Sequence, residues 1–295
     1  MFRKLGLLVA LALMLSACSG QEPKPWVAGN GAIKVVASTD VWGSVANLVG
    51  GNAITSTALI YKATQDPHSY EPSARDQLAI NEADIVIING GGYDDFMLKL
   101  IAADPNRPIV VNAFAVAGGD KNRNEHIWYD VDQVGTVAKA IASAIIQAQP
   151  KQAATVGDSL AKFQASLTKS KSHLEAIKAS GTCGRVFSTE PVIDYLLEDA
   201  GCQRVTPIEF SRAIEEERDV PPAVMKQAKQ ELSVAGTKLA VNQSLTSSQI
   251  EELYSVQPVA YRFGELLPQI TNSGLAVTRD YFDMLNGAIA FVEGF

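Results

Sequence analysis

Short apolar runs alternate with amphipathic stretches along most of the chain. In the first half the apolar runs are Lys34–Thr39, Ile54–Ile60, Asp84–Asn89 and Pro108–Phe114. Short β-branched runs of this kind are typical of buried parallel strands. Helices are predicted between them, near Val41–Val49, Ser73–Asn81 and Tyr93–Ala102.

The second half repeats this alternation. Its apolar runs are Arg185–Thr189, Arg204–Phe210, Leu239–Gln243 and Pro258–Phe263. Its predicted helices lie near Val192–Ala200, Pro222–Ala235, Ser247–Ser255 and Asp280–Phe291. Strands that alternate with helices indicate α/β layers joined by crossover helices.

Two long amphipathic helices are predicted between the halves. The first covers Val131–Gln147, and the second follows Gln149-Pro150 with apolar residues at helical spacing as far as Ile177. Because the second helix has no strand on its N-terminal side, we interpret it as a spine. The fold expected is α/β with two lobes, each a mainly parallel sheet flanked by helices, bridged by one long helix. The lobes are predicted at residues 32–150 and 181–295 and the linking helix at residues 151–180.

Composition excludes several classes of protein. Of the 295 residues, 47% are hydrophobic and 19% charged, which excludes a disordered chain, a coiled coil or collagen. The net charge is −7, and no cluster of Lys and Arg provides the basic stripe that nucleic-acid binding needs. Nucleic acid is therefore not an expected partner.

The N-terminus has the pattern of a secretory signal. Arg3 and Lys4 precede the apolar run Leu5–Leu15, which is too short for the roughly 20 residues of a spanning helix. Leu15-Ser16-Ala17-Cys18 resembles a bacterial lipobox, in which the cysteine carries lipid. Residues 1–18 are therefore predicted to be a lipoprotein signal peptide with a lipidated Cys18, and residues 19–31 a tether. This predicts an extracytoplasmic protein anchored to the membrane by lipid; the alternative is an uncleaved anchor helix.

The cysteine count agrees with a lipidated Cys18. The chain has three cysteines, and lipid on Cys18 leaves Cys183 and Cys202 free to pair in an oxidising compartment. The alternative is two unpaired core cysteines.

Two of the three histidines lie in predicted loops that follow strands. His68 is in the proline-flanked segment Asp66–Pro72, and His126 is at a loop–helix boundary in Asn124–Asp130. A neutral imidazole in such a position is a common metal ligand, although a loop histidine taken alone is more often a surface residue. His173 lies on the polar side of the linking helix and is expected to be solvated.

The segments DPHSYEPS and EHIWYD, around His68 and His126, resemble the solute-binding lipoproteins of bacterial ABC importers for zinc and manganese. The resemblance covers nearly the whole chain from Lys34. It implies two α/β lobes bridged by a long helix, with one divalent metal ion bound between them as cargo. It also implies a monomer that delivers the ion to a membrane permease and its ATPase, and no enzymatic activity.

The resemblance further implies two metal ligands from each lobe. In the first lobe they fall on His68 and His126. In the second lobe they fall on Glu190, after one strand, and on Glu265, after the last strand, where the family usually has Asp; Asp280 is the reserve candidate. All four main candidates follow the carboxyl ends of strands, where α/β sheets bind ligands. Two carboxylates would also neutralise a dication.

The identity of the metal follows less directly. A set of two histidines and two carboxylates binds zinc more tightly than manganese by the Irving–Williams order, so zinc is favoured and manganese is next. The His-rich loop of many zinc receptors of the family is absent, since Ala115–Glu125 contains no histidine. The acidic run Glu215–Asp219 is interpreted as a solvated surface rather than an ion lure.

Two other functions stay open. A secreted metal-dependent hydrolase would usually carry three ligands and a His-Glu-x-x-His pair, and the chain contains no such pair and no Gly-x-Ser-x-Gly elbow. A surface adhesin or scaffold would use the same fold without metal.

Overall fold

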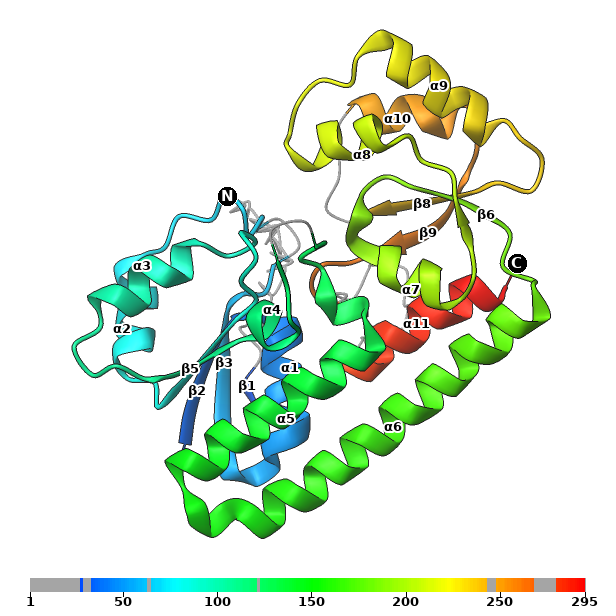
Figure 1. Ribbon diagram of the computed structural model, residues 1–295. Coiled ribbons are helices and arrows are strands. Elements are labelled where there is room, and N and C mark those ends of the chain that lie inside the picture. The colour runs from blue at the N-terminus through cyan, green and yellow to red at the C-terminus, as the bar shows by residue number, and fades with distance from the viewer. Residues whose placement is uncertain are drawn as a thin grey trace, which may run out of the picture.

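The computed structural model describes residues 27–28, 33–62, 65–120, 123–242, 248–267 and 280–294. In this part of the chain two parallel-stranded sheets are flanked by helices, and one long helix runs beside both lobes (Figure 1). The predicted α/β fold with two lobes and a linking helix is confirmed. The predicted signal peptide and Cys18 lie outside the described residues. Within those residues, no helix combines the length and the apolar character needed to cross a bilayer.

The first lobe is built on a five-stranded sheet. Its strands are β1 (Val27–Ala28), β2 (Ile33–Thr39), β3 (Ile54–Ile60), β4 (Ile85–Ile88) and β5 (Ile109–Asn112), in the order β1-β3-β2-β4-β5. The four longer strands are parallel and match the four predicted ones, whereas β1 is antiparallel to β3. β1 lies within residues 19–31, the predicted tether, and it was not expected from the sequence.

Side-chain alternation places a hydrophobic core on each face of this sheet. In β2, Val35 and Ala37 face one core and Val36 faces the other. The first face is covered by α1 (Asp40–Gly50) and α5 (Val131–Ala148), and the second by α2 (Ala74–Asn81) and α3 (Phe96–Ala103); α4 (Ala113–Val116) follows β5. Helix α3 begins at Phe96 and not at Tyr93 as predicted, because the turn that starts at the glycines Gly90, Gly91 and Gly92, all with positive φ, continues to Asp95.

The second lobe has a four-stranded parallel sheet. Its strands are β6 (Arg185–Ser188), β7 (Gln203–Arg204), β8 (Lys238–Asn242) and β9 (Val259–Phe263), in the order β7-β6-β8-β9. One face packs against α7 (Asp194–Asp199) and α11 (Tyr281–Glu293), and the other against α8 (Ile208–Glu215), α9 (Pro222–Leu232) and α10 (Ser248–Tyr254).

The strand predicted at Arg204–Phe210 is wrong over most of its length. Only Gln203–Arg204 pairs with β6, and the helix α8 begins at Ile208. Pro207 has no backbone N–H to give to a sheet, and it lies immediately before the helix, where that missing donor costs nothing. Phe210 is fully buried on α8 and contacts the ring of Phe187 on β6. Its apolar character therefore serves helix packing instead of a strand.

Helix α6 (Ala153–Ser180) connects the lobes, and the single helical turn η3 (Pro150–Gln152) precedes it. Phe163, Leu167, Leu174 and Ile177 are buried on its inner face, as their spacing predicts, and Gly181 ends it with a left-handed φ of 63°. One hydrophobic core runs from the first sheet past α6 and α11 to the second sheet. The exact domain boundaries stay a prediction.

The predicted disulfide between Cys183 and Cys202 is confirmed. Cys183 precedes β6 and Cys202 precedes β7, so the bond joins the amino ends of two neighbouring strands. The carboxyl ends of the strands, where ligands are expected, lie at the opposite edge of the same sheet.

Candidate metal centre

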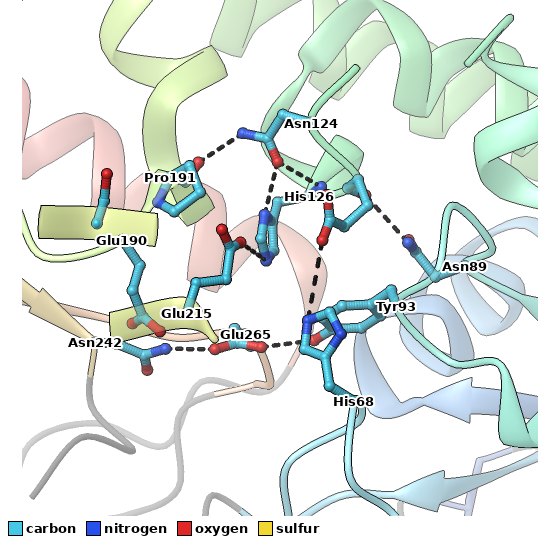
Figure 2. A network of polar contacts seen from close by, with 12 residues as sticks. His68, Asn89, Tyr93, Asn124, His126, Glu190, Pro191, Glu215, Asn242 and Glu265 are labelled. Atoms are coloured by element: carbon cyan, nitrogen blue, oxygen red, sulfur yellow. Dashed lines mark hydrogen bonds and ion pairs between the residues drawn. The ribbon is translucent and has the colours of Figure 1, made fainter. Parts of the chain in front are cut away.

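Polar side chains from both lobes come together beyond the carboxyl ends of the strands. His68 and His126 come from the first lobe, and Glu190, Glu215, Asn242 and Glu265 come from the second (Figure 2). The four main candidates of the sequence analysis are all in this group. We call these six residues, together with Glu125, the polar cluster.

His68 lies in the loop that follows β3, where local hydrogen bonds fix the backbone. Asp66 accepts a hydrogen bond from the His68 N–H at 3.0 Å and another from the Ser69 hydroxyl at 2.8 Å. The imidazole rests edge-on against the ring of Tyr93, with 5.1 Å between the ring centroids. About a third of the His68 side chain is exposed (34%). His68 is thus held in place while one side of its ring remains accessible.

His126 is buried and held in one tautomer. It lies just before the single turn η2 (Ile127–Tyr129), and only 2% of it is exposed. Its Nδ1 lies 2.6 Å from Asn124 Oδ1, an oxygen that can only accept, so Nδ1 carries the proton. Burial, together with the nearby His68, lowers the pKa of His126 to about 3. The imidazole is therefore neutral, and Nε2 presents a lone pair to the polar cluster.

Asn124 also connects the two lobes. Its amide nitrogen donates to the carbonyl of Pro191 at 2.7 Å, and Pro191 begins the single turn η4 (Pro191–Ile193) directly after Glu190. One side chain thus orients a histidine of the first lobe and contacts the segment that carries a glutamate of the second.

Glu190 follows β6 and is almost completely buried, with 7% exposed. Its Oε2 has no hydrogen-bond partner among the described residues. Burial, followed by the charges of Glu265 and Glu215, raises its pKa well above the usual range, and a hydrogen bond with Asn242 opposes the shift. An isolated buried carboxylate of this kind is costly unless a proton or a cation compensates its charge.

Glu265 follows β9 and is held by residues of both lobes. Its Oε2 accepts a hydrogen bond from the Tyr93 hydroxyl at 2.9 Å, and its Oε1 accepts one from the Asn242 amide. Burial raises its pKa, while these two hydrogen bonds and His68 act in the other direction. Tyr93 belongs to the first lobe and Asn242 ends β8 in the second, so Glu265 lies where the lobes meet.

The segment that carries Glu265 is itself anchored in the first lobe. Leu266 packs into the core between the first sheet and helices α2 and α3. The Leu267 N–H donates to the carboxylate of Asp40 at 3.0 Å, and the Tyr129 hydroxyl donates to the Gly264 carbonyl at 3.1 Å. Residues 264–267, directly after β9, are therefore fixed by contacts with the opposite lobe.

Two carboxylates of the polar cluster were not expected as site residues. Glu215, at the end of α8, lies with Oε1 3.9 Å from His126 Nε2 and only 26% of its side chain exposed, so the prediction of a solvated surface is wrong for it. Glu125 Oε1 lies 3.9 Å from His68 Nε2. One ligand atom from each of His68, Glu125 and His126 fits within 4.8 Å of the others, a spacing suitable for one metal ion. The sequence signal for Glu125 is its position next to His126.

Asp280, the reserve candidate, has a structural task. It is the N-cap of α11, and its Oδ1 accepts hydrogen bonds from the backbone of Phe282 at 2.8 Å and Asp283 at 3.1 Å. Such a cap satisfies otherwise unpaired N–H groups at the start of the helix. This use of the carboxylate favours Glu265 over Asp280 as the fourth candidate ligand.

The polar cluster combines two imidazoles with carboxylates, and two of the carboxylate oxygens, Glu190 Oε2 and Glu215 Oε1, lack a hydrogen-bond donor among the described residues. Neutral imidazole and carboxylate are the ligands of divalent transition metals, and the cluster contains no thiolate for a softer ion. A dication bound between the lobes would compensate charges that burial otherwise disfavours. The arrangement is thus suited to binding a cation.

Comparison with known proteins agrees with this chemistry. The family model described as zinc-uptake complex component A, periplasmic, matches residues 35–291. The chain is 24% identical over 148 residues to the manganese-binding lipoprotein MntA of Halalkalibacterium halodurans, and the match spans about half (48%) of that protein. It is 25% identical over 256 residues to the iron ABC transporter substrate-binding lipoprotein MtsA of Streptococcus pyogenes, covering 76% of this chain and 81% of MtsA.

Solved structures share the fold. The periplasmic zinc-binding protein TroA of Treponema pallidum is 15% identical with a TM-score of 0.73, covering 90% of this chain and 99% of that one. The manganese-bound periplasmic metal-binding protein of Candidatus Liberibacter asiaticus is 17% identical with a TM-score of 0.68, covering 89% and 98%. The family match covers the parallel strands of both sheets and the linking helix, and leaves out β1 and the first two residues of β2. The chain therefore belongs to the zinc-uptake complex component A family of metal-binding receptors of ABC importers.

Proposed function

We propose that this protein is an extracytoplasmic receptor that binds one divalent transition-metal ion between its lobes and delivers it to an ABC permease. The observation that supports this most directly is that the lobes contribute complementary ligand atoms to the polar cluster: the first presents the lone pair of a neutral His126 Nε2, and the second presents the buried Glu190 Oε2, which has no hydrogen-bond partner among the described residues. His68 and Glu265 complete the proposed four ligands. Zinc is the favoured cargo and manganese the next, because zinc binds such a ligand set more tightly.

The same four proposed ligands favour metal binding over catalysis as the function. A catalytic zinc keeps an open position for water beside three protein ligands, whereas a receptor site with the four ligands proposed here would leave no such position. The relative MtsA is described as an ABC transporter substrate-binding lipoprotein, a binding protein and not an enzyme. Lipid on Cys18 would hold the monomeric receptor at the membrane, near its permease and ATPase.

The proposal is tested by metal content. Purified protein stripped with a chelator and reloaded with zinc or manganese should retain about one ion per chain by elemental analysis. His68→Ala and His126→Ala should each lose most of this metal, because each removes an imidazole donor. His173→Ala is the matched control, since His173 lies on α6 and pairs with Glu293 at 3.0 Å, outside the polar cluster.

Other outcomes identify the alternatives. Wild-type protein that retains no metal after reloading would contradict the receptor and favour the scaffold. Turnover of ester or peptide substrates by the loaded protein would favour the hydrolase.

A further inference from the structure

Glu215 occupies a position that helix stability does not explain. It is the last residue of α8, where the helix dipole disfavours a negative charge. The chain turns sharply after it. Glu217 has a φ of 52°, and the Arg218 N–H donates a hydrogen bond to the Ala213 carbonyl at 2.8 Å. Glu216 and Glu217 are exposed, whereas the Glu215 side chain points into the polar cluster (Figure 2).

The carboxylate of Glu215 lacks a compensating group. Its Oε1 is buried without a hydrogen-bond partner in the part of the chain that the structure describes. The distance of 3.9 Å from Oε1 to His126 Nε2 is too long for a hydrogen bond. Burial, followed by the charges of Glu125 and Glu265, raises the pKa of Glu215 to about 7. Its charged neighbours in the polar cluster are thus other carboxylates.

Glu190 supplies an independent observation at the same place. Its side chain is more than nine-tenths buried, and its Oε2 also lacks a partner among the described residues. The second lobe thus contributes two buried oxygens without hydrogen-bond partners to the polar cluster, Glu215 Oε1 beside His126 Nε2 and Glu190 Oε2 near the charges of Glu215 and Glu265. Three acceptor atoms with no proton donor among them are the environment that a cation requires.

We propose that Glu215 is a fifth protein ligand of the cargo ion and that it increases the affinity for manganese relative to zinc. This inference rests on the proposed function and adds one carboxylate, from helix α8, to the four proposed ligands. Zinc is satisfied by four ligands in a tetrahedron, whereas manganese prefers six ligands, mostly oxygen. An additional carboxylate oxygen therefore raises the affinity for manganese more than the affinity for zinc. It reduces the advantage in affinity that the Irving–Williams order gives zinc over manganese.

The test compares Glu215→Gln with Glu217→Gln in the full protein. Both variants remove one negative charge from the same short segment, but only Glu215 points into the polar cluster. Manganese affinity is measured from the free-ion signal in electron paramagnetic resonance, and zinc affinity by competition with a chromogenic chelator. X-ray absorption of the manganese-loaded proteins reports the number of atoms bound directly to manganese.

Glu215→Gln should lose at least about tenfold in manganese affinity, because even partners one step removed from a metal are worth about 10- to 100-fold. The loss of zinc affinity should be smaller. The manganese ion in this variant should be bound by one carboxylate oxygen fewer than in the wild type. Glu217→Gln should match the wild type in all three measurements.

The inference is overturned if Glu215→Gln binds both ions with the same affinity as Glu217→Gln. It is also overturned if Glu215→Gln loses affinity for zinc and manganese equally and the atoms bound to manganese do not change. The proposed function fails separately, when the wild-type protein binds neither ion.

Discussion

At the scale of single residues, the orientation of His126 depends on Asn124. The Asn124 side-chain oxygen receives the His126 N–H groups of both backbone and ring, and its nitrogen reaches the Pro191 carbonyl. Partners of this kind fix the tautomer and the direction of a ligating imidazole. Asn124 is not itself a proposed ligand; it hydrogen-bonds to His126, which is one.

Asn124→Ala should therefore weaken zinc binding by about 10- to 100-fold without unfolding the protein. The loss should appear in a chelator competition assay, while the far-ultraviolet circular dichroism stays that of the wild type. Asn124→Asp retains an acceptor oxygen for Nδ1–H and should recover part of the affinity. Wild-type affinity in Asn124→Ala would contradict the positioning role.

At the scale of elements, the short segment 264–267 follows β9 of the second lobe in the chain but packs against the first lobe. Its residues Gly264, Leu266 and Leu267 contact the first lobe through two hydrogen bonds and one buried side chain. Glu265, between them, is thereby held close to Tyr93. The anchoring of this short segment therefore controls the position of the proposed fourth ligand.

Leu266→Ala should lower both stability and metal affinity. Removal of a buried leucine side chain costs about 2–5 kcal/mol, and here it also frees the Glu265 loop. Leu100→Ala is the matched control, because Leu100 of α3 is buried in the same core but does not belong to the segment that carries Glu265. Denaturant unfolding should show similar losses in both variants, and zinc titration a loss in Leu266→Ala alone. Equal zinc affinities would show that the anchoring has no role in binding.

At the scale of the whole molecule, buried carboxylates couple folding to pH and to metal. Asp40 and Glu215 have folded-state pKa values raised to about 7, from 3.8 and 4.5. Raised values mean that the folded apoprotein holds protons that the unfolded chain releases. The contribution of these groups to the free energy of unfolding is thus present at low pH and is lost as the pH rises toward 7.

Metal binding to the carboxylates of the polar cluster should have the opposite pH dependence, so that the ion stabilises the fold more as the pH rises. With the proposed ligands, a metal ion would replace the protons on Glu190, Glu215 and Glu265, and this replacement would become easier as the pH rises. His126 does not compete, because its pKa of about 3 keeps it neutral throughout. The increase in melting temperature on adding zinc should therefore be larger at pH 7.5 than at pH 5.5 in scanning calorimetry. An increase that is equal at both pH values, or larger at pH 5.5, would contradict proton–metal competition.

The sequence by itself determined most helices and strands, and it singled out the two histidines, His68 and His126, that the structure places in the polar cluster. Strands such as β3 and β4 and the helix α6 followed from apolar patterns, because those patterns record which face of each element is buried. The strand predicted at Arg204–Phe210 failed because apolar residues of a helix and of a strand look alike over a few positions, and Pro207 decided between them.

Only the tertiary structure decided which carboxylates share a site. Glu215 stands in an acidic run that resembles a solvated surface, and it lies beside His126 only because α8 packs on the second sheet and its end faces the first lobe. Asn124 and Leu266 likewise act across the lobes, through contacts between segments far apart in sequence. A local pattern reports burial and backbone geometry, whereas the convergence of side chains depends on how distant elements pack.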